Sequence, residues 1–195
     1  MTIALFQESP GDVSQQLATM RQSLSASFFE AYRKSSTNEA DLMFCLDQFS
    51  NLIAAARSPF PDSLALVSQW PERMSEARSK GYLISDLMLP KLAPALENSA
   101  ARLAEMRAGR TAIAIERYRL ANGTAAPIAL NSLVPSYLSA VPSDPFDGKP
   151  LRYRKSTKGY IVYSVGPDRT DDKGTAPKKG SSADAKYDLV FAVDR

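Results

Sequence analysis

Apolar residues recur at helical spacing through the first half of the chain. They return every three or four residues over residues 13–32 and again over residues 42–53, which places each set on one face of a helix. Asp12 can cap the first helix, expected over about 12–34, and the second is expected over about 39–56. The breaker at 58–62 ends the second helix, and Pro71, Gly81 and Pro90 divide the next stretch into short elements.

A longer helix is predicted over about residues 92–121. Steps of three and four define one apolar stripe, which we expect to be buried. The stripe consists of Leu92, Leu96, Ala100, Leu103, Met106, Ile113 and Leu120. Arg110 and Arg117 interrupt it, which argues against a strict coiled-coil seam. Asn122 and Gly123 come next, and either can take the left-handed conformation that ends a helix.

The pattern changes to short strands after Gly123. Residues 130–138 indicate one or two helical turns, and 142–148 form a turn-rich connector. Strands are predicted over about 151–154, 160–165 and 187–193, with a tight turn at Lys158-Gly159 that makes the first two antiparallel. A polar loop of unusual length separates the last two strands.

A sheet this small needs a helix on one face, so the expected fold class is α+β. We expect a helical region over 1–90, followed over 91–195 by the long helix packed on a three-stranded antiparallel sheet. Eight residues are expected in the shared core: Ile113, Tyr118, Leu120, Leu133, Ile161, Tyr163, Leu189 and Phe191.

The amino-acid composition excludes several classes of function, because the chain has little net charge, no histidine and a single cysteine. The 195 residues include 24 basic and 21 acidic ones, and a net charge of +3 is too small to argue for nucleic-acid binding. The chain has no histidine, which removes Ser-His-Asp and Cys-His catalysis and the commonest general base. Cys45 is the single cysteine, so no intrachain disulfide can form, and its apolar neighbours predict a buried thiol. We therefore expect a protein that is not an enzyme.

The sequence contains no apolar run of transmembrane length and does not begin with a signal peptide. Two expectations about the location of the protein remain open. The chain is either cytoplasmic, or a fragment whose targeting segment lies upstream.

Several short motifs between the end of the long helix and the loop occur in an order typical of one family. They are the helix end 111–123, the connector 133–146 with its Asp144-Pro145-Phe146, the hairpin with Tyr153 and Gly159-Tyr160, and Tyr163-Ser164-Val165-Gly166 followed by Asp168 and Asp171-Asp172. From about residue 98 to 195, the chain resembles the globular head of a type II secretion major pseudopilin. The family's apolar N-terminal helix has no counterpart here.

The resemblance implies a calcium site in the loop after the second strand. Its ligands would be the carboxylates of Asp168, Asp171 and Asp172 and the carbonyl of Val165, oxygen donors of the kind that calcium prefers. A solvated turn rich in Asp and Gly is the alternative. The resemblance also implies an extracytoplasmic location and partners among envelope or pseudopilus-like proteins, with any membrane attachment through a segment outside this chain.

Two other charged groups have structural interpretations. Asp144 and Asp147 flank Phe146 and are expected to cap a turn. Arg152, Arg154, Lys155 and Lys158 are expected to be edge charges that oppose strand aggregation. The function expected is a structural or interaction protein with a pseudopilin-like head. The alternative is a soluble binding module whose helical half holds a ligand or a partner protein.

Overall fold

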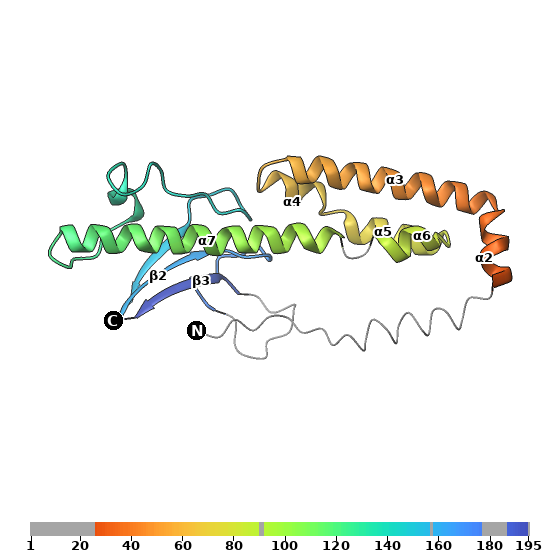
Figure 1. Ribbon diagram of the computed structural model, residues 1–195. Coiled ribbons are helices and arrows are strands. Elements are labelled where there is room, and N and C mark those ends of the chain that lie inside the picture. Colours follow the sequence, from red (N-terminus) through yellow and green to blue (C-terminus); the bar gives the residue numbers. More distant parts are fainter. Residues whose placement is uncertain (1–25, 90–91, 157, 177–186, 195) are drawn as a thin grey trace.

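The computed structural model describes residues 26–89, 92–156, 158–176 and 187–194, and has the α+β fold that the sequence predicts. Its elements, in chain order, are α2 (Ala26–Arg33), α3 (Ser36–Arg57), α4 (Asp62–Leu66), α5 (Trp70–Ser79), α6 (Leu83–Met88), α7 (Leu92–Ala121), the 3-10 helix η1 (Leu130–Leu133), β1 (Arg152–Ser156), β2 (Gly159–Ser164) and β3 (Leu189–Asp194). We call α2 to α6 the helical part, and α7, the connector and the sheet the α+β part. Figure 1 shows α7 along the axis of an elongated molecule, with the sheet on one side and α3 and α4 on the other.

The helical part has its own apolar cluster. Ser35 caps α3 by accepting a hydrogen bond from the Asn38 backbone N–H at 3.3 Å. Pro71 occupies the first turn of α5, where its missing N–H costs nothing. The buried members of the cluster are Cys45, Ala55, Val67, Trp70, Met74 and Leu89. The predicted burial of the Cys45 thiol is therefore confirmed.

Asp41 of α3 holds α6 in place. Its side chain is fully buried and accepts hydrogen bonds from the backbone N–H groups of Ile84 at 2.7 Å and Ser85 at 3.0 Å. The hydroxyls of Ser85 and Tyr32 also donate to this carboxylate. A carboxylate from a neighbouring helix thus caps α6, whose own N-cap residue, Tyr82, makes no side-chain cap.

The sheet has the order β1-β2-β3 and is antiparallel throughout. Tyr153, Val162 and Phe191 lie opposite one another in the register. The helix α7 covers one face, and its inward side is lined by small residues. These are Ala100, Ala104, Ala108, Thr111 and Ala112, together with Ile115. Small side chains let the helix approach the sheet closely, and the bulky Tyr160 of β2, almost fully buried, fills the space between them.

The predicted apolar stripe of α7 is confirmed at its beginning and wrong over its second half. Ala100 is fully buried and Leu96 packs against the cluster of the helical part. Met106, Ile113 and Leu120 are instead 64%, 66% and 82% exposed and point away from the core. The pattern misleads because the buried face consists of alanines, which rank low as apolar residues although they pack tightly. Of the other expected core residues, Leu133 and Tyr163 are buried, Tyr118, Ile161 and Leu189 are half-buried, and Phe191 is 41% exposed beside Gly109.

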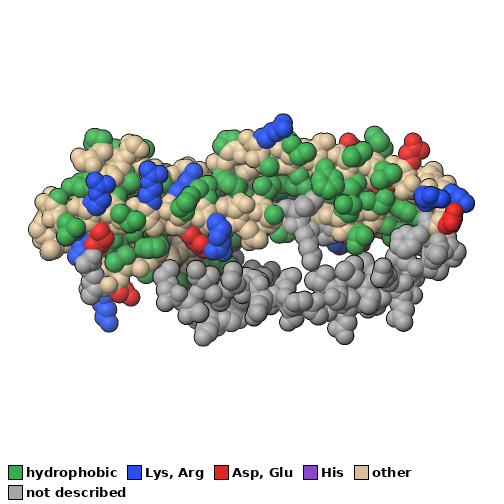
Figure 2. All heavy atoms as spheres, in the orientation of Figure 1, with side chains coloured by type: hydrophobic (Ala, Val, Ile, Leu, Met, Phe, Trp, Pro, Cys, Tyr) green, Lys and Arg blue, Asp and Glu red, His purple; other side chains and the backbone are tan. Residues whose placement is uncertain are grey.

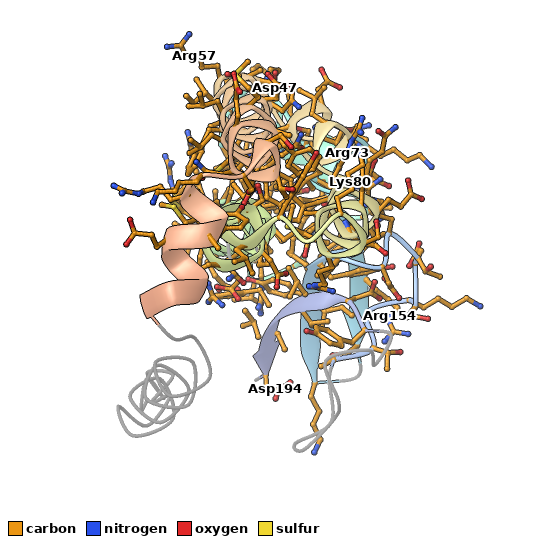
Figure 3. All side chains as sticks on the ribbon, turned by 90° about the vertical axis from the view of Figure 1, so that its right-hand side faces the viewer. Asp47, Arg57, Arg73, Lys80, Arg154 and Asp194 are labelled. Carbon is orange, nitrogen blue, oxygen red and sulfur yellow. The ribbon has the colours of Figure 1, made fainter. Side chains whose placement is uncertain are left out.

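One apolar cluster joins the two parts of the molecule. Leu64 of α4 packs with Ala100 and Ala104 of α7, and with Phe146 and Val165 of the α+β part. In Figure 3, Asp47 and Arg57 of α3 lie on one side of the molecule, and Arg154 and Asp194 of the sheet lie on the other. The cluster therefore lies where α7 separates the helices from the sheet.

Candidate functional site

Asp144 anchors the connector to the end of β2. Its side chain is fully buried, and its Oδ2 accepts a hydrogen bond from the Val165 backbone N–H at 2.9 Å. Its Oδ1 accepts from the Ser164 hydroxyl at 2.8 Å and from the Phe146 backbone N–H at 3.0 Å. The contact with Phe146 is the turn cap that the sequence predicts. The contacts with Ser164 and Val165 fix the start of the loop that carries the predicted calcium ligands.

Arg152 neutralises the buried charge. Its guanidinium donates to Asp144 Oδ2 at 2.8 Å and also binds Asp147. Asp147 caps its own turn by accepting from the Lys149 backbone N–H at 3.0 Å. Burial opposes the ionisation of Asp147, but the hydrogen bonds from Arg152 and from the Lys149 backbone N–H, together with the charges of Arg152 and Lys149, hold the Asp147 pKa below its usual value. Arg152 is thus a half-buried partner of Asp144 and Asp147, with Asp171 Oδ2 4.0 Å from its Nε, and its predicted role as an edge charge is wrong.

The loop after β2 folds back over the face of the sheet that α7 leaves open. A side chain at Gly174 would place its Cβ 2.2 Å from Ile161 Cδ1 and 3.3 Å from the Tyr163 ring, so the backbone lies directly on these residues. The Tyr163 hydroxyl donates to Asp171 Oδ1 at 3.2 Å. Burial, and then the adjacent charge of Asp171, raise the Tyr163 pKa to about 12.

Asp188, just before β3, ties the described part of this loop to the sheet. Its side chain is fully buried and accepts from the backbone N–H groups of Gly174 at 2.6 Å and Asp172 at 3.4 Å. The Asp188 backbone N–H donates to the Thr175 carbonyl at 2.9 Å. Desolvation raises the Asp188 pKa despite these bonds, because burial disfavours the charged form.

The three predicted calcium-binding carboxylates have different surroundings. Asp168 accepts from the Thr170 backbone N–H at 3.1 Å, and Asp171 accepts from that of Lys173 at 2.9 Å, so each closes its own turn. Asp172 Oδ2 is buried and has no hydrogen-bond partner among the residues that the structure describes. Val165 is buried at the start of the loop. Among the described residues, no three acidic or cysteine side chains converge as a metal site requires.

One feature of this loop nevertheless suits a cation. The unpartnered oxygen of Asp172 and the buried carboxylate of Asp188 belong to residues that are hydrogen-bonded to each other, and an orphaned buried carboxylate oxygen is costly unless a donor or a cation meets it. The resemblance names Asp172 but not Asp188. Asp188 was missed because only the return of β3 to the sheet brings it to the loop.

A cavity of about 400 Å³ lies beside α5. It is lined by α5, by the residues just before α5 and by the beginning of α7. The lining residues are Val67, Ser68, Trp70, Pro71, Met74, Arg78, Pro94 and Glu97. Most of them are apolar, and Arg78 is already paired with Asp86 at 2.8 Å. The cavity therefore suits an apolar group.

Comparisons with known proteins do not assign the chain to a family. No family model matches it, and neither the curated proteins nor the solved structures contain a match. Among the described residues, no helix is long and apolar enough to cross a bilayer.

Proposed function

We propose that this chain is a non-enzymatic structural or interaction protein of the cell envelope, with a pseudopilin-like head. The observation that carries the proposal is the arrangement of the α+β part. A long helix, a connector and a three-stranded antiparallel sheet follow one another, and Asp144 bonds the connector to the end of β2. The motifs that carry the resemblance lie at the joints of this arrangement.

The contacts of the head support a rigid docking module. Asp144 and Arg152 lock the connector, and Asp188 fixes part of the loop. Tyr153 donates to the Pro127 carbonyl at 3.1 Å, and Lys155 to the Ala126 carbonyl at 3.1 Å, so β1 also holds the segment between α7 and η1. Side chains held this way lose little entropy when a partner binds, which favours recognition.

Location in the native cell tests this proposal. An epitope tag on the chromosomal gene, followed by fractionation and chemical cross-linking, should place the protein in the envelope fraction and cross-link it to a pilin-like protein. A cytoplasmic marker protein is the control. Recovery in the cytoplasmic fraction alone would contradict the proposal.

We also propose that calcium binds the loop after β2, through Asp168, Asp171, Asp172 and the Val165 carbonyl. The buried, unpartnered Oδ2 of Asp172 supports this, although the loop must move to bring Asp168 and Asp171 onto the same ion. Calcium would then stabilise the fold in proportion to the logarithm of its concentration.

Calorimetry on chelator-treated protein tests the calcium proposal. Binding heat and a rise in melting temperature are expected for the native chain, and both should be lost in the double variant D171N/D172N. Asp194→Asn, which changes an exposed carboxylate at the end of β3, is the matched control. An absence of heat, with a melting temperature unmoved by calcium, means that no such site exists.

The cavity beside Trp70 supports the alternative function, a soluble module that binds an apolar ligand. Trp70 is the only tryptophan of the chain, so its fluorescence reports on this cavity. An apolar dye such as anilinonaphthalene sulfonate should bind saturably and alter that fluorescence, and Ser68→Trp should block it. Ser79→Trp, at the exposed end of α5, should not. Equal dye binding by both variants would remove this alternative.

A further inference from the structure

The outward face of α7 carries a regular seam of apolar and basic residues. We define it as Met106, Arg110, Ile113, Arg117 and Leu120, all of which are exposed. The steps between them are four, three, four and three residues, so they share one face of the helix, although the two arginines make it a mixed apolar and basic face and not a strict coiled-coil seam. The apolar members recur every seven residues and so drift by only about 20° at each step. The seam extends for about 21 Å along the helix.

Within the described residues, the apolar members of this seam are exposed, and only Arg117 is engaged, by the Tyr137 ring. The sheet packs on the alanine side of α7, roughly opposite the seam. Arg117 lies 5.8 Å from the centre of the Tyr137 ring, and no ion pair to Arg110 or Arg117 occurs in the described parts of the chain. Figure 2 shows hydrophobic side chains interspersed with Lys and Arg, and with some acidic side chains, over the region of α7. Exposed apolar residues aligned along one helix face, with arginines between them, suit the docking of a second helix.

We propose that this seam binds an amphipathic helix that carries acidic residues beside its apolar stripe. The apolar stripe of a second helix can pack against Met106, Ile113 and Leu120, which are seven residues apart. Carboxylates beside that stripe would then pair with Arg110 and Arg117. Pairing between complementary charges selects the partner and its register.

The charge of the seam disfavours a second copy of this chain. Both charged residues of the seam are basic, so two copies would bring four guanidinium groups into one interface. The nearest acidic residues lie off the seam and are engaged. Glu116 interacts with Arg119 and with the Tyr160 hydroxyl, and Glu105 with Arg102 at 2.6 Å. An acidic helix from a different protein is therefore the better complement.

The inference rests on the proposed function and deepens it, because it names the surface of this chain that binds a partner and the chemistry of that partner. The proposed function and the seam proposal can fail separately. The location of the protein is tested in cells, whereas the seam is tested with purified protein.

Two synthetic helical peptides of three heptads serve as probes. Both carry leucine at the apolar positions, and one has glutamate and the other lysine at the flanking positions. Fluorescence anisotropy should show the glutamate peptide binding at least about tenfold more tightly than the lysine peptide, and more weakly as salt rises. The double charge reversal R110E/R117E should invert this preference. Ile113→Ser should weaken binding of the glutamate peptide about tenfold.

Arg154→Glu is the matched control, because Arg154 is an exposed arginine of β1 and lies off the seam. It should leave both affinities unchanged, and circular dichroism melts should show that every variant is folded. The proposal is overturned if neither peptide binds saturably, or if charge reversal does not invert the preference. Self-association in sedimentation that Ile113→Ser abolishes would overturn it too, since a second copy would then be the occupant.

Discussion

Three fully buried aspartates organise the chain at the scale of single residues. Asp41 caps α6, Asp144 fixes the connector, and Asp188 holds the loop to the sheet. Each accepts hydrogen bonds from backbone N–H groups contributed by a distant segment, which is how a buried carboxylate avoids the cost of desolvation. Sequence reasoning identified the local turn of Asp144 but not these distant bonds, because an aspartate alone does not indicate which backbone it will meet.

Replacing Asp41 with asparagine tests this organisation. Burial opposes its ionisation, but the hydrogen bonds from the Ser85 and Tyr32 hydroxyls and from the Ile84 and Ser85 backbone N–H groups together lower the Asp41 pKa below the ordinary 3.8. Because the folded pKa is depressed, this stabilisation is present at neutral pH and is lost as pH falls through the folded value, below 3.8. At pH 7, Asp41→Asn should cost about 1–3 kcal/mol of unfolding free energy.

Urea unfolding at neutral and at strongly acidic pH measures this difference, which should shrink in acid. Asp47→Asn is the control, because Asp47 lies on the exposed side of the same helix (Figure 3). Equal stability of the two variants at neutral pH would show that Asp41 does not hold α6.

At the scale of elements, α7 has two faces with opposite roles. Ile115 is fully buried against the sheet, and Ile113, two residues earlier, is 66% exposed on the seam. Aspartate at position 115 should lower the unfolding free energy by roughly 3 kcal/mol or more, because it buries an unpaired charge. Aspartate at position 113 should change it by about 0.5 kcal/mol or less. Thermal melts of the two variants compare the faces directly, and a larger loss at 113 would contradict the orientation of α7.

The elements themselves were predictable to a good degree. The helix α7, the two antiparallel strand pairs and the turn at Gly159 follow from periodicity and from glycine and proline placement, all of which are local. The orientation of the second half of α7 was not, because the outward residues Met106, Ile113 and Leu120 are larger apolar residues than the inward alanines. The candidate site was predicted only in part for a related reason. Asp188 and Arg152 reach it through the register of the sheet, which local patterns do not specify.

At the scale of the molecule, the cluster around Phe146 couples the helical part to the α+β part. Leu64 of α4 is buried in this cluster, whereas Leu66 of the same helix is 55% exposed. Leu64→Ala should cost about 2–5 kcal/mol, because it opens a cavity where the two parts meet. Leu66→Ala should cost about 0.5 kcal/mol or less.

Trp70 fluorescence reports on the helical part, and amide hydrogen exchange in β2 reports on the sheet. In Leu64→Ala both should show lower stability, since the parts share the cluster. A loss confined to the Trp70 signal would mean that the two parts unfold independently.

The lengths of the two connections between strands also predict the order in which the strands pair during folding. Only residues 157–158 separate β1 from β2, whereas residues 165–188 must close before β3 can join. Because closing a longer loop costs more entropy, the β1-β2 hairpin should form early and β3 should dock after the rate-limiting step. Val162→Ala in β2 should therefore slow folding, while Val193→Ala in β3 should mainly accelerate unfolding, as stopped-flow kinetics would show. A force applied at Asp194 would then separate β3 from β2 before the β1-β2 hairpin opens.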